Sequence, residues 1–375
     1  MNVEGELSIH IGDDVRITSS RPVCASRVLI GKSPQQALET VPLLFSICGV
    51  AQARTALLAM QSELSTAEET AREILLKIEI AREHLLRILL DYPGLFNLEL
   101  QRTSLPEISQ LNQLWRKALF KDGKAFSFNS ELDFDEAECR LLSSRLEAVI
   151  NKQVFHCSTS QWLEIESLSA LESWAENCSS AAAISLQQIG RQGWYDQGNS
   201  NCPPLPELTR RELVKKFDSA NADAFIARPS WGGKYYESTV LTRQLCSPLI
   251  KRLFKQFNNA LISRWVARLV ETAQVSSQVK LLLEKLSNNS NDLVQNNNHE
   301  IAQVEAARGR LIHRVQIQND LIVNYQVLAP TEWNFHPQGL IKQALSNLKT
   351  EKLEPLAHIM INAIDPCVGY RLRVS

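Results

Sequence analysis

The sequence has no long apolar run, no excess of one charge and no C-x-x-C pair. No apolar run approaches the ~20 residues that a bilayer-spanning helix needs, so we expect no membrane partner. The 40 Lys and Arg residues nearly balance the 41 Asp and Glu residues, which argues against a nucleic-acid partner. Residues 1–6 lack the basic and then apolar pattern of a signal peptide, so we expect a cytoplasmic protein.

The eight cysteines are spread along the chain, at Cys24, Cys48, Cys139, Cys157, Cys178, Cys202, Cys246 and Cys367. In a cytoplasmic protein, most are expected to be reduced and buried as small apolar groups. Two stand in half-complete metal motifs, S-I-C-G-V-A at 46–51 and D-P-C-V-G-Y at 365–370. Ala51 and Tyr370 occupy the positions of the second cysteines. Each half is incomplete alone, because two thiolates clamp a metal and one does not.

Length and patterning favour a globular protein with many helices. At 375 residues, the chain can form one large domain or two ordinary ones. Alternating apolar residues predict hairpins at 3–18 and 311–328, and helical patterns cover 41–60, 65–90, 106–190, 249–286 and 355–364. Ser65 and Glu68 predict a capping box at the start of the clearest helix. The polar, Asn-rich residues 287–299 predict an exposed loop.

The two half motifs share a setting although they lie near opposite ends of the chain. Cys48 and Cys367 both stand at a predicted helix end among apolar residues. A fold that brings the two ends together around one core would place these cysteines side by side. We therefore expect a single domain over residues 1–375.

Short sequence blocks occur in a familiar order over nearly the whole chain. They are V-E-G-E-L at 3–7, G-K-S-P at 31–34, I-C-G-V at 47–50, P-S-W at 229–231 with the Glu, Leu and Arg that follow, R-W-V-A-R-L-V-E at 264–271, A-R-G at 307–309, N-Y-Q at 324–326, P-T-E-W-N at 330–334 and D-P-C at 365–367. Together they resemble the large subunit of nickel-iron hydrogenases. The resemblance implies an α+β fold, mainly helical, with small antiparallel sheets and both ends meeting in the core.

The resemblance also shows where this sequence differs from the family at the metal-ligand positions. In that family, each C-x-x-C supplies one terminal thiolate to nickel and one thiolate that bridges nickel and iron. By position, Cys48 and Cys367 match the terminal ligands, while Ala51 and Tyr370 replace the bridging ones. An alanine methyl cannot replace a thiolate. We therefore expect no nickel and no hydrogen-splitting activity.

Two outer positions have changed as well. Thr55 and Arg373 stand where the family has histidines. The chain ends at Ser375, so we expect no C-terminal extension for a maturation protease to remove. Both points favour a non-catalytic relative of the family.

The resemblance implies that the surroundings of the iron are kept. In the family, the iron carries two cyanides and one carbon monoxide, held by an A-P-R-G segment and a P-T/S segment. The matching residues are Arg308, Pro330 and Thr331, and Glu4 matches a proton-relay glutamate. The implied ligand is a transient iron centre, Fe(CN)2CO, with Cys48 and Cys367 as metal contacts. Plainer interpretations are packing for the cysteines, an ion pair for Arg308, a turn cap for Thr331 and a strand-edge carboxylate for Glu4.

The expected function follows from the loss of the bridging cysteines and the retention of the residues around the iron. The sequence resembles hydrogenase maturation factors of the HupK or HoxV type, which are implicated in assembling the iron unit. Expected partners are accessory chaperones that carry the same iron unit, and the immature large subunit. Two other classes remain open: a redox-inactive structural subunit of a hydrogenase-like complex, and an enzyme with a different mononuclear site.

Overall fold

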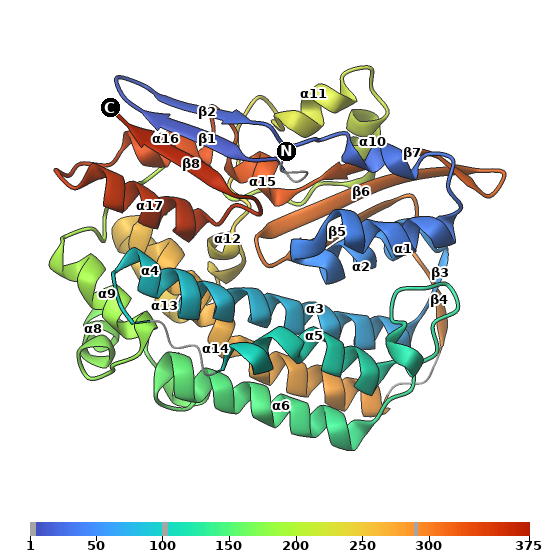
Figure 1. Cartoon of the computed structure of the whole chain (residues 1–375), viewed down its shortest axis with the longest axis horizontal. Helices are drawn as coiled ribbons and strands as arrows, with labels where there is room; N and C mark the ends of the chain where they lie inside the picture. The colour runs from blue at the N-terminus through green and yellow to red at the C-terminus, as the bar shows by residue number, and fades with distance from the viewer. Residues whose placement is uncertain (1–4, 100–103, 289–291) are drawn as a thin grey trace.

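The computed structural model describes residues 5–99, 104–288 and 292–375, whose elements form two layers (Figure 1). Long helices lie in the lower layer of that view, and most β-strands, with the helices that cover them, lie in the upper layer. The described ends of the chain both lie in the upper layer. The predicted α+β fold, mainly helical with small sheets, is confirmed.

Helices account for most of the described chain. The α-helices are α1 (Pro34–Leu44), α2 (Gly49–Met60), α3 (Thr66–Leu86), α4 (Tyr92–Leu95), α5 (Leu105–Leu119), α6 (Glu136–Ile150), α7 (Thr159–Leu163), α8 (Leu168–Glu176), α9 (Ala181–Arg191), α10 (Arg210–Phe217), α11 (Ala222–Ala227), α12 (Val240–Gln244), α13 (Pro248–Phe257), α14 (Leu261–Asn288), α15 (Pro330–Asn334), α16 (Leu340–Ser346) and α17 (Leu353–Ile364). Short 3-10 helices are η1 (Ala25–Leu29), η2 (Ser46–Cys48) and η4 (Lys121–Gly123). Two π-helical turns, η3 (Arg87–Asp91) and η5 (Asn151–Phe155), extend α3 and α6.

The strands form three small sheets. They are β1 (Leu7–Ile11), β2 (Val15–Ser19), β3 (Glu63–Ser65), β4 (Leu293–Gln295), β5 (Ile301–Ala306), β6 (Gly309–Gln318), β7 (Leu321–Leu328) and β8 (Tyr370–Val374). The sheet orders are β2-β1-β8, β3-β4 and β5-β6-β7.

The lower layer is a bundle in which α3, α5, α6 and α14 pack against one another (Figure 1). The hydroxyl of Ser65 accepts the N–H of Glu68 at 3.2 Å, which caps α3 at the predicted place. Ile74, Ile78 and Leu85 are buried at helical spacing and face the rest of the bundle. The bundle thus holds α3 rigidly, and α3 in turn supplies groups that reach the upper layer.

Buried ion pairs tie α14 to its neighbours. Arg264 lies 3.0 Å from Glu237, and Arg243 lies 2.7 Å from Glu271. Removing one partner of such a pair leaves a buried charge and costs about 3–5 kcal/mol. These pairs fix the packing of the helices on which the upper layer rests.

One sheet joins the two ends of the chain. β1 pairs with β2 as the predicted hairpin and, on its other edge, runs parallel to β8, with Leu7 opposite Tyr370 and Ile11 opposite Val374. The hairpin predicted at 311–328 is β6 and β7. β3, β4, β5 and β8 were not predicted from the sequence. The parallel pairing of β1 and β8 brings the segment after α17 beside the N-terminal segment.

Residues 287–299 do not form one exposed loop, which corrects the prediction for this segment. α14 continues to Asn288, and β4 pairs with β3. The buried amide of Asn296 donates to the carbonyls of Leu58 and Gln61, each at 2.6 Å. These two bonds fasten the segment to the end of α2, whereas the polarity of the sequence alone indicated a solvated loop.

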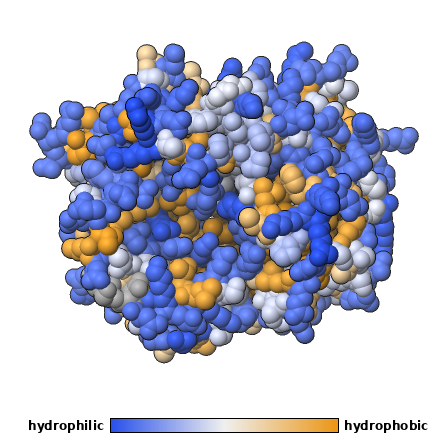
Figure 2. Space-filling model, turned by 180° about the vertical axis from the view of Figure 1, so that it is seen from behind, coloured by the Kyte–Doolittle hydropathy of each residue, from blue (hydrophilic) through white to orange (hydrophobic). Residues whose placement is uncertain are grey.

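Hydrophilic side chains cover most of the face shown in Figure 2, with smaller hydrophobic groups between them. Within the described ranges, no single helix is long and apolar enough to cross a membrane. α1 and residues 46–60 meet that test only together, as a pair bent by 103°.

Candidate functional site

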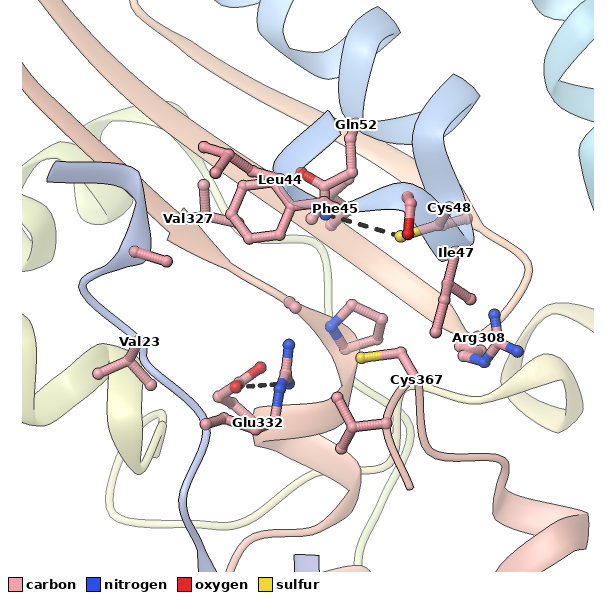
Figure 3. Close-up of a pocket in the computed structure, with 18 of the residues that line it drawn as sticks. Val23, Leu44, Phe45, Ile47, Cys48, Gln52, Arg308, Val327, Glu332 and Cys367 are labelled. Atoms are coloured by element: carbon pink, nitrogen blue, oxygen red, sulfur yellow. Dashed lines mark hydrogen bonds and ion pairs between the residues drawn. The ribbon is translucent and has the colours of Figure 1, made fainter. Parts of the chain in front are cut away.

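Cys48 and Cys367 line one cavity of about 110 Å³ (Figure 3). Cys48 ends η2, and Cys367 lies between α17 and β8. Figure 3 shows both sulfur atoms turned toward the cavity. One water needs about 10–15 Å³ on this scale, so the cavity has room for a group of several heavy atoms. The two half motifs therefore meet, as the sequence predicted.

A break between α1 and α2 positions Cys48. The backbone leaves the helical region at Phe45, with φ and ψ of -127 and 60 degrees, and again at Cys48, with -119 and 46 degrees, on either side of the short turn of η2. The N–H groups of Val50 and Ala51 donate to the carboxylate of Glu79 at 2.7 and 2.9 Å. Glu79 thus satisfies two of the free N–H groups at the start of α2. Ala51 is fully buried and presents no ligand atom to the cavity.

The turn at the end of α17 positions Cys367. α17 ends at Asp365, whose φ of 67 degrees turns the chain, and Pro366 cannot continue the helix. The Asp365 carboxylate lies 3.1 Å from Arg308, 2.9 Å from Arg87 and 3.4 Å from Arg268. Burial opposes its ionisation, but the three guanidinium groups outweigh burial and hold the pKa of Asp365 well below its usual value. Cys367 therefore follows a turn fixed by charge.

The Cys48 thiol is protonated at neutral pH. Burial raises its pKa to about 12, the charges of Glu79 and Cys367 add to the rise, and Arg308 opposes it. The amide nitrogen of Gln52 lies 3.7 Å from the Cys48 sulfur. Because a metal binds the thiolate, loading a metal onto Cys48 would release a proton.

Arg308 lies at the same cavity with one buried donor unused. Its Nε donates to Asp365 at 3.1 Å, and its Nη2 donates to Glu83 at 3.0 Å. Within the described chain, Nη1 is buried and has no hydrogen-bond partner. A buried donor without a partner is costly, so it marks a place where a ligand acceptor can bind.

Pro330 and Thr331 begin α15 beside Cys367. Pro330 lines the cavity. The Thr331 hydroxyl donates to the Cys367 sulfur at 3.0 Å and accepts the Cys367 N–H at 3.3 Å. In this structure, Thr331 positions the cysteine, and its predicted contact with a cyanide stays a prediction. Glu4 lies outside the described residues.

The sequence analysis missed an ion pair in the cavity wall. Arg21 Nη1 lies 2.6 Å from Glu332 Oε1, and both residues line the cavity. Glu332 stands where the family pattern P-T-T-W-N has its second Thr, so a signal was present in the sequence. Arg21 belongs to none of the matched blocks.

A buried hydrogen-bond chain fixes the amide of Gln52. Its oxygen lies 2.8 Å from His313 Nε2, and His313 Nδ1 lies 2.9 Å from the hydroxyl of Tyr325. Burial lowers the pKa of His313 to about 3, so the ring is neutral. With its oxygen bonded to His313, Gln52 turns its NH2 group toward Cys48.

The described residues contain no group of three or more His, Cys, Asp or Glu side chains that could hold a metal ion. A metal bound between Cys48 and Cys367 would therefore have to bring its remaining ligands with it.

Comparison with known proteins finds relatives of nearly the same length. The hydrogenase expression/formation protein HoxV of Cupriavidus necator is 28% identical, over 99% of this chain and 96% of its own. The hydrogenase expression/formation protein HupK of Azotobacter vinelandii is 26% identical, over 93% of this chain and 90% of its own.

Solved structures share the fold. The Ni-Fe-Se hydrogenase from D. vulgaris Hildenborough has a TM-score of 0.64 at 15% identity, covering 95% of this chain and 94% of its own. An NAD+-reducing NiFe hydrogenase has a TM-score of 0.62 at 17% identity, covering 94% of this chain and 92% of its own. The model of the nickel-dependent hydrogenase family matches residues 173–369, more than half of the sequence. This chain therefore belongs to the nickel-dependent hydrogenase family.

Proposed function

We propose that this protein is a non-catalytic hydrogenase maturation factor that transiently holds an iron centre with two cyanides and one carbon monoxide. This iron unit is its cargo, and Cys48 and Cys367 are the contacts to iron. Relatives of nearly full length are named as hydrogenase expression/formation proteins, which supports a role in maturation. The site residues support the more specific role.

The observation that carries the proposal is the meeting of two thiols and one unused guanidinium donor at a single cavity. Cys48, Cys367 and Arg308 all line it, and Arg308 Nη1 has no partner within the described chain. Cyanide on iron is an anionic acceptor, so a guanidinium in a dry pocket forms a charge-assisted hydrogen bond with it. The iron unit already carries three diatomic ligands, so it needs few ligands from the protein, and the cavity lining offers two thiols.

The positions of the missing cysteines support a non-catalytic role. Ala51 is fully buried, and the Tyr370 hydroxyl lies 2.9 Å from His358 Nδ1; neither residue lines the cavity. Neither residue offers an atom that could join two metals at this cavity. Two thiolates also hold a metal less firmly than four, which suits a protein that must release its cargo.

Loading and release then become proton-linked steps. The Cys48 thiol loses its proton as it binds iron and regains it when the iron unit leaves.

We further propose two partners for the iron unit. An accessory chaperone that carries the same unit delivers it to this protein, and the immature large subunit receives it. The exchange occurs in the cytoplasm, which keeps thiols reduced.

Infrared spectroscopy tests the proposal. The protein is purified from a host that makes the iron unit, and the cyanide and carbonyl stretching bands are measured. We expect these bands in the wild type and their loss in Cys48→Ala and in Cys367→Ala. Cys246→Ala is the matched control, because Cys246 is exposed and lies outside the cavity lining.

Two outcomes count against the proposal. Wild-type protein without such bands, in a stable complex with a hydrogenase-like partner, would leave the structural-subunit interpretation. Bands of full strength in both alanine variants would place the iron unit elsewhere.

A further inference from the structure

The hydroxyl predicted to hold one cyanide is already in use. Thr331 Oγ1 donates to the Cys367 sulfur at 3.0 Å and accepts the Cys367 N–H at 3.3 Å. A hydroxyl has a single hydrogen to donate, so Thr331 has none left for a ligand. Arg308 Nη1 can serve one cyanide, and the second cyanide needs a donor from another part of the cavity wall.

Arg21 supplies unused donors in that wall. It follows β2, its side chain is 14% exposed, and it lines the cavity. Among the residues that the structure describes, its side chain bonds only Glu332. A guanidinium carries five N–H donors, so one bond to Glu332 leaves several for a ligand.

Glu332 fixes the guanidinium of Arg21 at the cavity. Its side chain is 9% exposed and stands in the first turn of α15, directly after Thr331. In the view of Figure 3, Cys367 lies between Glu332 and Arg308. The Arg21 pair and Arg308 therefore approach the cavity from different elements, one from α15 and the segment after β2, the other from the turn between β5 and β6.

The charges of the loaded site favour two guanidinium groups. Iron(II) with two cyanides is neutral, so binding by two thiolates leaves two negative charges at the centre. Burial lowers the pKa of both Arg21 and Arg308, but their carboxylate partners outweigh it, so both stay charged. Once iron binding has converted the two thiols to thiolates, both sulfurs add to the attraction that each arginine feels.

We infer that Arg21, positioned by Glu332, is the second anion-binding residue of the cavity and donates to one cyanide, while Arg308 donates to the other. The inference rests on the proposed function and deepens it, because it assigns to Arg21 the role that the sequence gave to Thr331. It also explains why an acidic residue stands at position 332, where the family pattern has Thr.

The test compares a pair of charge-removing changes at the cavity with a similar pair at the surface. The double variant Arg21→Gln with Glu332→Gln keeps polar side chains at both positions but leaves no charge on either. We expect about ten-fold less bound iron unit, as for the loss of one charge-assisted bond, and a shift of one cyanide band. Arg308→Lys should shift the other cyanide band.

The control is Arg27→Gln with Asp223→Asn, which removes an ion pair whose side chains are 60% and 63% exposed. It should leave both bands and the amount of iron unit unchanged.

Two single variants complete the series. Arg21→Lys should bind more iron unit than the double variant and less than the wild type, since it keeps the positive charge but not the planar guanidinium. Thr331→Val should lower the amount without shifting a cyanide band.

The outcomes separate this inference from the proposed function. If the wild type has the bands and Cys48→Ala loses them, but the double variant keeps both cyanide bands and the full amount, then Arg21 is not an anchor and the maturation role stands. If the double variant does not fold, as judged by thermal unfolding, Arg21→Lys decides, and unshifted cyanide bands overturn the inference. Wild-type protein without bands overturns both.

Discussion

The two halves of the cavity rest on two buried carboxylates that are stabilised in opposite ways. Asp365, before Cys367, is surrounded by three guanidinium groups. Glu79, below Cys48, is held by two backbone N–H groups. The cations hold the pKa of Asp365 well below its usual value, whereas burial raises the pKa of Glu79 to about 7 although the two N–H bonds oppose the rise.

The difference predicts opposite responses to pH. Because the pKa of Asp365 is lowered on folding, its stabilisation is present above its unfolded pKa and is lost only in strong acid. Because the pKa of Glu79 is raised on folding, its contribution is complete below its unfolded value and is lost as the pH rises through about 7. The Asp365 carboxylate beside Cys367 therefore stays charged except in strong acid, whereas the Glu79 carboxylate beside Cys48 changes its charge near neutral pH.

The largest expected effect is the loss of charge at Asp365. Asp365→Asn leaves three arginines without their shared carboxylate, so we expect the free energy of unfolding to fall by about 3–5 kcal/mol. Chemical denaturation measures it. Asp91→Asn, which removes a partly exposed partner of Arg87, should cost about 1 kcal/mol or less. Equal losses in the two variants would contradict the assigned role of Asp365.

Glu79→Gln should give the next largest effect, seen as a change in how stability depends on pH. The wild type should lose about 3 kcal/mol of stability from this group as the pH rises from about 4.5 to about 7, and the variant should lack that loss. Unfolding free energies at about pH 5 and about pH 8 measure it. Glu131→Gln, at an exposed carboxylate paired with Lys121, should keep the wild-type profile. A variant profile that matches the wild type would show that Glu79 does not titrate in this range.

A smaller effect is expected from Thr331→Val, which removes the hydrogen bond to the Cys367 sulfur. We expect Cd²⁺ affinity, followed by thiolate-to-metal absorption, to fall about five-fold, or about 1 kcal/mol. The control is Thr242→Val, whose hydroxyl bonds the Thr239 carbonyl at 2.7 Å in α12. If both variants bind Cd²⁺ as the wild type does, Thr331 does not prepare Cys367 for metal.

No gain of hydrogen uptake is expected when the two missing cysteines are restored. Ala51→Cys adds a sulfur at a fully buried position, and Tyr370 lies outside the cavity lining. Thr55 and Arg373 still stand where the resemblance expects histidines. A gas-phase hydrogen assay of the Ala51→Cys, Tyr370→Cys variant checks this, and measurable uptake would contradict the non-catalytic assignment.

The sequence predicted those parts of the fold whose signals are local. The Ser65 cap, the β1–β2 hairpin and the β6–β7 hairpin follow from residues a few positions apart. β8 could not be predicted, because its short segment forms a strand only against β1, at the other end of the chain. For the same reason, the Asn-rich segment was interpreted as a loop although Asn296 fastens it to α2.

The site residues also fall into those that local motifs predicted and those that only long-range contacts reveal. Cys48, Cys367, Arg308 and Pro330 were found through matched motifs, and the structure places all four at one cavity, while their roles toward iron remain proposals. The Arg21–Glu332 pair joins positions 311 residues apart, and no local pattern reveals such a contact. What the sequence could not show is therefore the set of long-range polar contacts.

The parallel pairing of β1 with β8 has a consequence for the order of events during synthesis. The bundle of α3, α5, α6 and α14 contains no residue beyond Asn288, so a growing chain can form it early. Cys367 and β8 leave the ribosome much later, and until they do, the N-terminal strand lacks its neighbour and Cys48 faces an unfinished wall. A nascent chain would thus be unable to receive the proposed iron unit prematurely, because the cavity is complete only after translation has passed β8.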